Sequence, residues 1–447
     1  MNIGGTLIAG AADQPLKGAF TPPGDKSMSH RAVMLASLAN GITEIEGFLP
    51  GEDNIATAKM FEAMGVTIEW LSDDQTKLRI HGVGLYGLQE PSQVLDAGNS
   101  GTCARLMTGV LAGQNFHTVL VGDASLHKRP MRRVAEPVRR MGAHVDGAKE
   151  GELLPLAIRG GNLKAMAFQS EVASAQVKSC VMFAALYAEG DTTVREPKPT
   201  RDHTERMFPL FGQPVSIDNS GLITVQPSGT LTAPAGVLHI PADPSSATFF
   251  AVATAIIPGS EVLLQQVGLN PRRDGWRRIL TAMGGDISLL QEKKIGDEPV
   301  SDIFIRGGGV HGINVDPNDV PDAIDEFPVL FVAAALAEGS FILSQAEELR
   351  VKESDRITTM VKALQACGAS IEEKPDGVII QGQKRLKGGV TVDAHGDHRI
   401  AMAMAVAAQC ADAPITIINA AAIATSFPSF VATAQQLGMN VAWKDEA

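Results

Sequence analysis

The stretch FEAMGVTIEW, residues 61–70, holds the pattern that decides the fold: a helix end, then Gly65, then alternating apolar and polar residues. Glycine readily adopts the left-handed conformation that ends many helices, and the alternation is typical of a half-buried strand. The pattern occurs six times. The other copies are RRMGAHVDG (Gly142), PLFGQPVSID (Gly212), TAMGGDISLL (Gly284), QACGASIEE (Gly368) and QQLGMNVAW (Gly438), so successive glycines lie 77, 70, 72, 84 and 70 residues apart. The sequence therefore predicts six similar α/β units.

A second series of helices alternates with the first. These Ala-rich helices are predicted to begin near Ser27, Thr102, Ser174, Ser245, Glu326 and Asp397. Since they are apolar nearly all round, we expect them to be buried. Units of this length suit compact subdomains better than an open solenoid. The stretches TPPGDK (21–26) and APAGVLHIPADP (233–244) best separate two domains of three units, one formed by residues 23–240 and the other by 1–22 plus 241–447.

Composition limits the possible functions. The 447 residues are 45% hydrophobic and carry a net charge of −12, which disfavours a nucleic-acid surface. No apolar run is long enough for a membrane span, and the first twenty residues do not resemble a signal peptide. The four cysteines are scattered, as in reduced cytoplasmic proteins. We expect a cytoplasmic protein without membrane or nucleic-acid partners, metal or cofactor.

Basic residues gather at the starts of the buried helices. Four of the six carry a cation in the first turn: Lys26, Arg105, Lys178 and Arg399. A helix N-terminus is already positive, so further cations there suggest that phosphate or carboxylate groups are bound. Two alternatives stay open: such residues are solvated surface, or they form salt bridges to Asp25, Asp96 or Asp397.

Three other stretches carry chemistry. The glycine-rich turn DAGNSGTCAR (96–105) has backbone N–H groups that could hold an anion. In AIDEFPVLFV, one of Asp325 and Glu326 can cap the helix, leaving the other for acid–base work. The stretch ELRVKESDR (348–356) has two interpretations. Either Glu353 pairs with the neighbouring cations in a proton-transfer site, or the stretch is a solvated helix start. The histidines of AHGDHRIAMAMAV (394–406) lack ligand-like spacing to other groups, which argues against a metal site.

Taken in order, these stretches resemble a known family. Eight stretches are similar to the motifs of the 5-enolpyruvylshikimate-3-phosphate synthases (3-phosphoshikimate 1-carboxyvinyltransferases): PGDKSMSHRA, LDAGNSGT, GDASLHKRPM, ASAQVKS, TRDHTE, IDEFP, ELRVKESDRI and DHRIAMAMAV. SAQVKS, TRDHTE and IATSFP resemble the bacterial class II branch more than the enterobacterial and plant type. The resemblance implies an α/β enolpyruvyl transferase fold. Each of two domains would hold three βαβαββ units about a pseudo-threefold axis, an inside-out α/β barrel, with the active site in the cleft between the domains.

The resemblance also implies an activity. The enolpyruvyl group of phosphoenolpyruvate would pass to the 5-hydroxyl of shikimate 3-phosphate, with release of phosphate, in the shikimate pathway to chorismate and aromatic amino acids. The protein would be a monomeric target of glyphosate.

The motifs imply the site residues. The catalytic residues would be Asp325 as base, Glu353 as acid and Lys26 at the departing phosphate. Shikimate 3-phosphate would be bound by Lys26, Ser27, Arg31, Ser174, Ala175, Gln176, Arg201, Asp325 and Lys352. Phosphoenolpyruvate would be bound by Lys26, Asn99, Gly101, Arg129, Gln176, Arg356 and Arg399.

One position departs from the pattern of many relatives. They have a lysine just before a TFP turn, whereas this chain has Thr425 and Ser426 in IATSFPSF, so the group that replaces the lysine is open. Two rival functions remain. The enolpyruvyl transferase that acts on UDP-N-acetylglucosamine uses a loop cysteine that GDASLHKRPM lacks. A non-catalytic anion-binding protein on the same scaffold would have no need of Asp325 and Glu353.

Overall fold

The computed structural model describes residues 4–444. Its contacts divide the chain into two compact units. Unit 1 comprises the chain up to Pro23, Pro241–Lys294 and the chain from Glu298 onward, and unit 2 comprises Gly24–Ile240 and Ile295–Asp297.

The six repeated glycines end helices as predicted. Each has a positive φ, between +78° at Gly212 and +116° at Gly142. The preceding helices are α2 (Glu52–Ala63), α4 (Arg132–Met141), α7 (His203–Leu210), α9 (Gly275–Ala282), α11 (Arg356–Ala366) and α13 (Phe430–Gln436). The strands that follow are β4 (Thr67–Trp70), β8 (His144–Gly147), β14 (Val215–Ile217), β18 (Asp286–Ile295), β21 (Ser370–Lys374) and β25 (Val441–Trp443). The sixfold repeat is confirmed.

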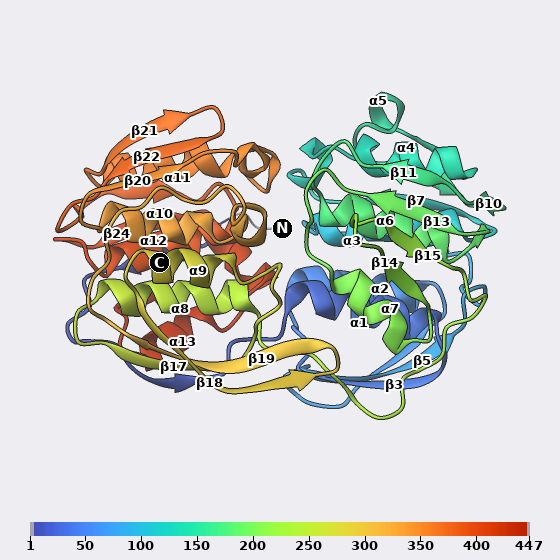
Figure 1. Cartoon of the computed structure of the whole chain (residues 1–447), viewed down its shortest axis with the longest axis horizontal. Coiled ribbons are helices and arrows are strands. Elements are labelled where there is room, and N and C mark those ends of the chain that lie inside the picture. Colours follow the sequence, from blue (N-terminus) through green and yellow to red (C-terminus); the bar gives the residue numbers. More distant parts are fainter. Residues whose placement is uncertain (1–3, 445–447) are drawn as a thin grey trace. The chain divides into compact units, whose positions relative to one another are not determined.

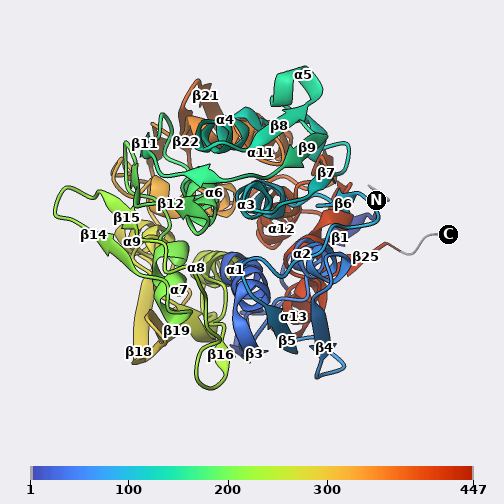
Figure 2. The ribbon, with the colours of Figure 1, turned by 90° about the vertical axis from the view of Figure 1, so that its right-hand side faces the viewer.

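The second helix series lies inside the units. It consists of α1 (Lys26–Leu38), α3 (Gly101–Ala112), α6 (Ala175–Ala185), α8 (Pro244–Ile256), α10 (Phe327–Ala335) and α12 (His398–Ala408). Every residue of α8, α10 and α12 is buried, as their apolar composition predicts. These three helices pack against one another in unit 1, and α3 contacts both α1 and α6 in unit 2 (Figures 1 and 2).

The sheets repeat one pairing scheme. A strand that follows each buried helix pairs antiparallel with a central strand, which pairs antiparallel with the strand that follows the glycine. In unit 2 the sheets are β16 (Leu238–His239)-β3 (Asn40–Glu46)-β5 (Lys77–Val83)-β4, β6 (Leu95–Asp96)-β7 (His117–Val121)-β9 (Leu156–Arg159)-β8, and β11 (Ala167–Gln169)-β13 (Thr192–Arg195)-β15 (Ile223–Val225)-β14, with a short pair β10 (Leu163–Lys164)-β12 (Ala188–Glu189). In unit 1 they are β18-β19 (Glu298–Arg306)-β17 (Glu261–Gly268)-β2 (Lys17–Phe20), β20 (Ser340–Leu343)-β22 (Gly377–Gln381)-β21, and β23 (Thr391–Asp393)-β24 (Ile415–Ile418)-β1 (Leu7–Ala9)-β25.

The N-terminal strand explains why unit 1 is discontinuous in sequence. β1 lies between β24 and β25 and pairs antiparallel with both, so it supplies the central strand of the sixth repeat. Each unit encloses a continuous hydrophobic core between its inner helices and its sheets. Across residues 4–444, the longest apolar helices fall short of what a membrane crossing requires.

Candidate active site

In unit 2, the first group of predicted site residues lies at the start of α1. Asp25 caps the helix, because its carboxylate accepts the Met28 N–H at 2.8 Å. The Lys26 ammonium lies 2.5 Å from Asp53 of α2. The salt-bridge alternative therefore applies to Lys26, with a partner that the sequence did not indicate. Next to it, Ser27 occupies the second position of the helix.

Arg31 lies one turn further on and is almost fully buried. Its guanidinium donates to the Thr204 hydroxyl and the Ser179 hydroxyl, each at 2.7 Å, and to the Ser27 carbonyl at 2.9 Å. Arg31 therefore joins α1 to α6 and α7. The neighbouring His30 is buried, and burial, assisted by Lys26 and Arg31, holds its pKa well below the ordinary value.

The glycine-rich turn places two guanidinium groups beside Gly101. Arg129 donates to the carbonyl and side-chain oxygens of Asn99, at 3.1 and 2.7 Å, and to Ser125 at 3.1 Å. Arg105 donates to Gln176 and to the Pro130 carbonyl. A Cβ atom on Gly101 would lie 3.0 Å from Arg105 Nη1 and 3.4 Å from Arg129 Nη1. The glycine thus leaves room for the two cations, and its φ lies outside the left-handed region.

The start of α6 adds Ser174, Ala175 and Gln176. Ser174 occupies the N-cap position without a side-chain capping bond, and Ala175 begins the helix. Gln176 donates to Thr102 at 2.9 Å, so α3 and α6 are joined at their N-termini. Arg201 lies between β13 and α7 and is half-buried.

Lys178 does not take part in this group. Its ammonium lies 2.7 Å from Glu196 and 2.8 Å from Glu205, and its side chain is 1% exposed. The prediction that it helps to bind an anion is wrong, and the salt-bridge alternative holds with different carboxylates.

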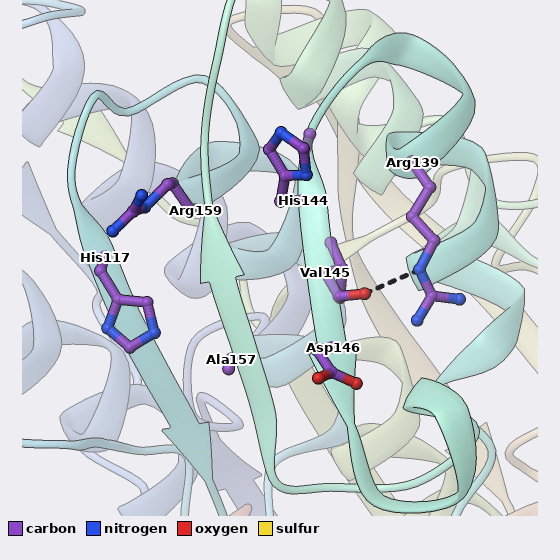
Figure 3. Close-up of a pocket in the computed structure, with 8 residues that line it drawn as sticks. His117, Arg139, His144, Val145, Asp146, Ala157 and Arg159 are labelled. Carbon is purple, nitrogen blue, oxygen red and sulfur yellow. Dashed lines mark hydrogen bonds between the residues drawn. The ribbon is translucent and has the colours of Figure 1, made fainter.

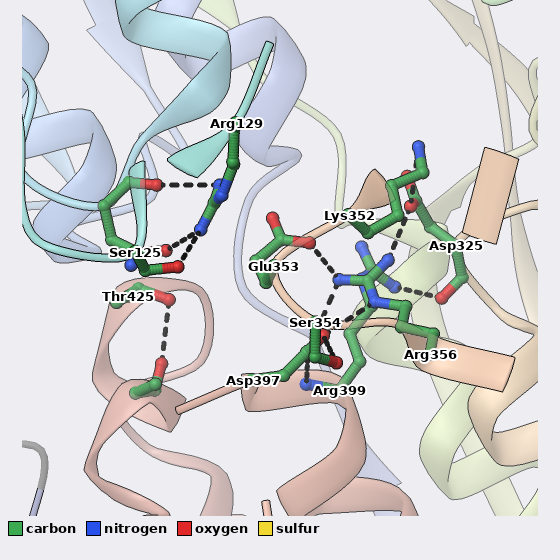
Figure 4. Close-up of polar contacts among 12 residues, drawn as sticks. Ser125, Arg129, Asp325, Lys352, Glu353, Ser354, Arg356, Asp397, Arg399 and Thr425 are labelled. Atoms are coloured by element: carbon green, nitrogen blue, oxygen red, sulfur yellow. Dashed lines mark hydrogen bonds and ion pairs between the residues drawn. The ribbon is translucent and has the colours of Figure 1, made fainter. Parts of the chain in front are cut away.

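In unit 1, the predicted residues gather around Arg356, the first residue of α11 (Figure 4). Its side chain is 1% exposed and donates to three carboxylates: Asp397 at 2.9 Å, Asp325 at 2.9 Å and Glu353 at 2.5 Å. Burial alone would lower the pKa of Arg356, but Asp397, Glu353 and Asp325 outweigh it and raise that pKa, so the guanidinium stays charged.

Two further cations complete this group. The Lys352 ammonium lies 3.5 Å from the Asp325 carboxylate, and Arg399 donates to the Asp325 carbonyl at 2.9 Å. Glu326 occupies the N-cap position of α10 but makes no capping bond, so the capping alternative is wrong for it. It accepts a hydrogen bond from Ser245 and lies 3.6 Å from Arg399.

Asp397 and Thr425, two other sequence candidates, also make contacts within their own turns. Asp397 caps α12 by accepting the Arg399 N–H at 2.9 Å. Thr425 donates to the Ala422 carbonyl at 2.8 Å, within its own turn. Within residues 4–444, no group of three or more His, Cys, Asp or Glu side chains is arranged to hold a metal ion.

A surface hollow lies elsewhere, on the sheet β7-β9-β8 (Figure 3). His117, His144 and Arg159 line it together with Arg139 and Asp146. No predicted site residue lines this hollow, so we do not assign the active site to it.

Sequence reasoning missed the polar residues that hold the site residues in place. These are Asp53 beside Lys26, Ser179 and Thr204 beside Arg31, and Ser245 beside Glu326. Ser179 and Ser245 carried a usable signal, because each is a polar residue of a largely apolar helix and buried polar side chains are nearly always hydrogen-bonded. Asp53 and Thr204 carried none, because they lie in the polar first turns of α2 and α7.

Each of the two groups has features that suit the binding of anions. Each unit carries several cations at helix N-termini, which suits phosphate and carboxylate groups. In unit 1, Asp325 and Glu353 both accept hydrogen bonds from the Arg356 guanidinium. Of two such carboxylates, one can serve as a proton acceptor and the other as a proton donor.

Comparison with known proteins identifies this arrangement. The fold is that of the enolpyruvyl transferases: the transferase NikO from Streptomyces tendae superposes with a TM-score of 0.80 at 14% identity, over 99% of this chain and 100% of that one. An EPSP synthase structure from Acinetobacter baumannii superposes with a TM-score of 0.87 at 44% identity, over 99% and 100% of the two chains. The predicted fold class is confirmed.

The sequence comparisons narrow this class to one family. The model of the family EPSP synthase (3-phosphoshikimate 1-carboxyvinyltransferase) matches residues 11–433. Proteins named 3-phosphoshikimate 1-carboxyvinyltransferase from Geobacter sulfurreducens and Methylococcus capsulatus are each 52% identical, over 95% of this chain and 97% and 96% of their own lengths. The chain belongs to the EPSP synthase family and is an enzyme, a transferase, as the motifs predicted.

Proposed function

We propose that the chain transfers the enolpyruvyl group of phosphoenolpyruvate to the 5-hydroxyl of shikimate 3-phosphate and releases phosphate. This step belongs to the shikimate pathway, which leads to chorismate and aromatic amino acids. The observation that carries the proposal is the pair Asp325 and Glu353 held by Arg356, with Lys352 beside it. A protein that only bound anions would gain nothing from two carboxylates placed among its cations.

Each substrate is bound by residues of both basic groups. Shikimate 3-phosphate is held by the starts of α1 and α6 together with Arg201, Asp325 and Lys352. Phosphoenolpyruvate is held by Lys26, Asn99, Gly101, Arg129, Gln176, Arg356 and Arg399. The fixed geometry of Arg129, which makes three hydrogen bonds, supports this role, because a guanidinium already oriented loses little freedom when it binds a carboxylate or phosphate.

The reaction takes place in two proton-balanced steps. Asp325 accepts the proton of the 5-hydroxyl as its oxygen attacks C2 of phosphoenolpyruvate, and Glu353 donates a proton to C3. The product is a tetrahedral ketal. Glu353, now a carboxylate, then takes a proton back from C3, which re-forms the double bond as the C2–O bond to phosphate breaks. Lys26 stabilises the leaving phosphate, which carries away the proton that Asp325 took from the hydroxyl. The surrounding arginines stabilise the anionic groups throughout.

We further propose that the substrates bind in a cleft between the two units, which close over them and exclude water. The protein would act as a monomer in the cytoplasm, with no nucleic-acid or membrane partner, and would be inhibited by glyphosate. The four cysteines support a reducing compartment, because none of them forms a disulfide.

A phosphate-release assay on the purified protein tests the function. Release is expected only when both shikimate 3-phosphate and phosphoenolpyruvate are present. Release from phosphoenolpyruvate alone at the same rate would mean that the protein is a phosphatase and that the proposal is wrong.

A further inference from the structure

A buried charge cluster lies in unit 2 just beneath the segment that carries Arg201. Lys178, Glu196 and Glu205 form it, and their side chains are 1%, 6% and 4% exposed. Burial works to lower the pKa of Lys178, but Glu205 and Glu196 outweigh it and raise that pKa, so the ammonium remains charged. Buried ion pairs are costly to desolvate, so such a cluster is weak support for stability alone.

The cluster is connected to the backbone of one residue, Thr200. The Lys178 ammonium donates to the Thr200 carbonyl at 3.3 Å, and Glu196 accepts the Thr200 N–H at 3.4 Å. Glu196 also accepts the Thr200 hydroxyl proton in a short hydrogen bond. All three polar groups of Thr200 are therefore held by two buried side chains, and the next residue is Arg201.

A second set of contacts fixes the other side of this segment. The hydroxyls of Ser179 and Thr204 lie 2.7 Å apart, and both accept hydrogen bonds from Arg31. Thr204 belongs to the first turn of α7, which follows Arg201. Consecutive residues of α6, Lys178 and Ser179, thus hold the chain on both sides of Arg201.

We propose that Lys178, Glu196 and Thr200 are positioning residues for substrate recognition, which fix the Arg201 guanidinium for the phosphate of shikimate 3-phosphate. The inference rests on the proposed function, since it takes Arg201 as a ligand of that phosphate. A fixed guanidinium matters because a bidentate contact with phosphate tolerates little displacement. The residues act through the backbone and do not touch the substrate themselves.

Thr200→Val tests the inference, because it removes the hydroxyl with little change of shape and leaves every buried charge paired. The KM for shikimate 3-phosphate is expected to rise roughly tenfold, the effect of loosening a hydrogen bond to a charged group. The KM for phosphoenolpyruvate and kcat should stay within about twofold. Thr200→Ser retains the hydroxyl and should restore the KM.

Thr108→Val is the matched control. Thr108 is buried in α3 and donates to the Ala104 carbonyl at 2.8 Å, so its replacement also removes a buried hydroxyl bond in unit 2. It should leave both KM values unchanged. A lowered melting temperature of Thr200→Val with an unchanged KM for shikimate 3-phosphate would mean that the cluster is only structural, and would overturn the inference.

A double-mutant cycle with Arg201→Gln separates this failure from a failure of the proposed function. Arg201→Gln should raise the KM for shikimate 3-phosphate, and adding Thr200→Val should then have no further effect. If Arg201→Gln leaves that KM unchanged, the phosphate role of Arg201 is wrong and the inference falls with it. If the two effects simply multiply, Arg201 binds the substrate but Thr200 does not act through it, which also overturns the inference.

Discussion

Replacing Gly101 with alanine is predicted to weaken glyphosate much more than phosphoenolpyruvate. The added methyl would lie 3.0 Å from Arg105 Nη1 and 3.4 Å from Arg129 Nη1. Both contacts are with the ends of flexible side chains, so the fold tolerates alanine if these groups move by a few tenths of an ångström. The Arg129 guanidinium is the less able of the two to move, because it donates hydrogen bonds to Asn99 and Ser125.

The size of the effect follows from this crowding. An extra methyl group in a well-packed site costs about 1–3 kcal/mol, which is roughly 5- to 150-fold in a binding constant. Glyphosate is longer than phosphoenolpyruvate, so we expect its inhibition constant to rise toward the upper figure and the KM for phosphoenolpyruvate to rise only a few-fold. Gly101 begins α3 outside the left-handed region, so the melting temperature should not fall.

The assay compares the wild-type protein with Gly101→Ala in steady-state phosphate release at varied phosphoenolpyruvate and glyphosate. Inhibition of the wild type should be competitive with phosphoenolpyruvate. Equal losses for the two ligands would refute the steric argument, as would a wild-type enzyme that is indifferent to glyphosate. A melting temperature lowered by several degrees would show instead that the turn itself requires glycine.

Three other predictions concern Asp325, His30 and compaction on ligand binding. Asp325→Asn should lower kcat by roughly 10²-fold or more. The affinity for shikimate 3-phosphate, measured by calorimetry, should stay nearly unchanged. Normal turnover in this variant would mean that Asp325 is not the base. Folding lowers the pKa of His30 below the ordinary histidine value of about 6.5. At a pH near 6.5 the unfolded state therefore binds more protons than the folded state. The free energy of unfolding should therefore fall as the pH drops from about 7 to 5. His30→Gln should show a shallower fall in melting temperature over that range. An identical fall in the variant and the wild type would mean that His30 is not the group responsible. Small-angle scattering should show a smaller radius of gyration when shikimate 3-phosphate and glyphosate are both added, because anions relieve the repulsion among the clustered cations; an unchanged radius would count against closure.

The sequence was sufficient for the fold because its signals are local. A glycine at each helix end and an apolar helix in each unit can be recognised without knowing any distant contact, and the predicted starts of the buried helices agree with the structure to within about one residue, inside the usual uncertainty of helix boundaries. The grouping of Asp325, Glu353 and Arg356 was also accessible, through motifs that resemble one family.

The partners of the buried cations were not accessible in the same way. Lys26 and Lys178 look alike in sequence, since each lies at the start of an apolar helix. Their partners come from other elements: Asp53 from α2, Glu196 from just after β13 and Glu205 from α7. Only the tertiary packing brings these carboxylates to the two lysines. A cation at a helix start is compatible with a bound ligand and with a buried ion pair, and the tertiary structure decides between them.

We expect the chain to transfer an enolpyruvyl group from phosphoenolpyruvate to shikimate 3-phosphate, with Glu353 as proton donor. Phosphorus NMR of a single reaction mixture tests this most directly, because it distinguishes the phosphates of phosphoenolpyruvate, shikimate 3-phosphate, its enolpyruvyl product and inorganic phosphate. The wild-type protein should form inorganic phosphate and the enolpyruvyl product in equal amounts, as both substrates disappear together. Glu353→Gln, in which the amide can still contact Arg356, should slow both signals in parallel. Inorganic phosphate that accumulates without the enolpyruvyl product, or a Glu353→Gln protein as fast as the wild type, would contradict the account.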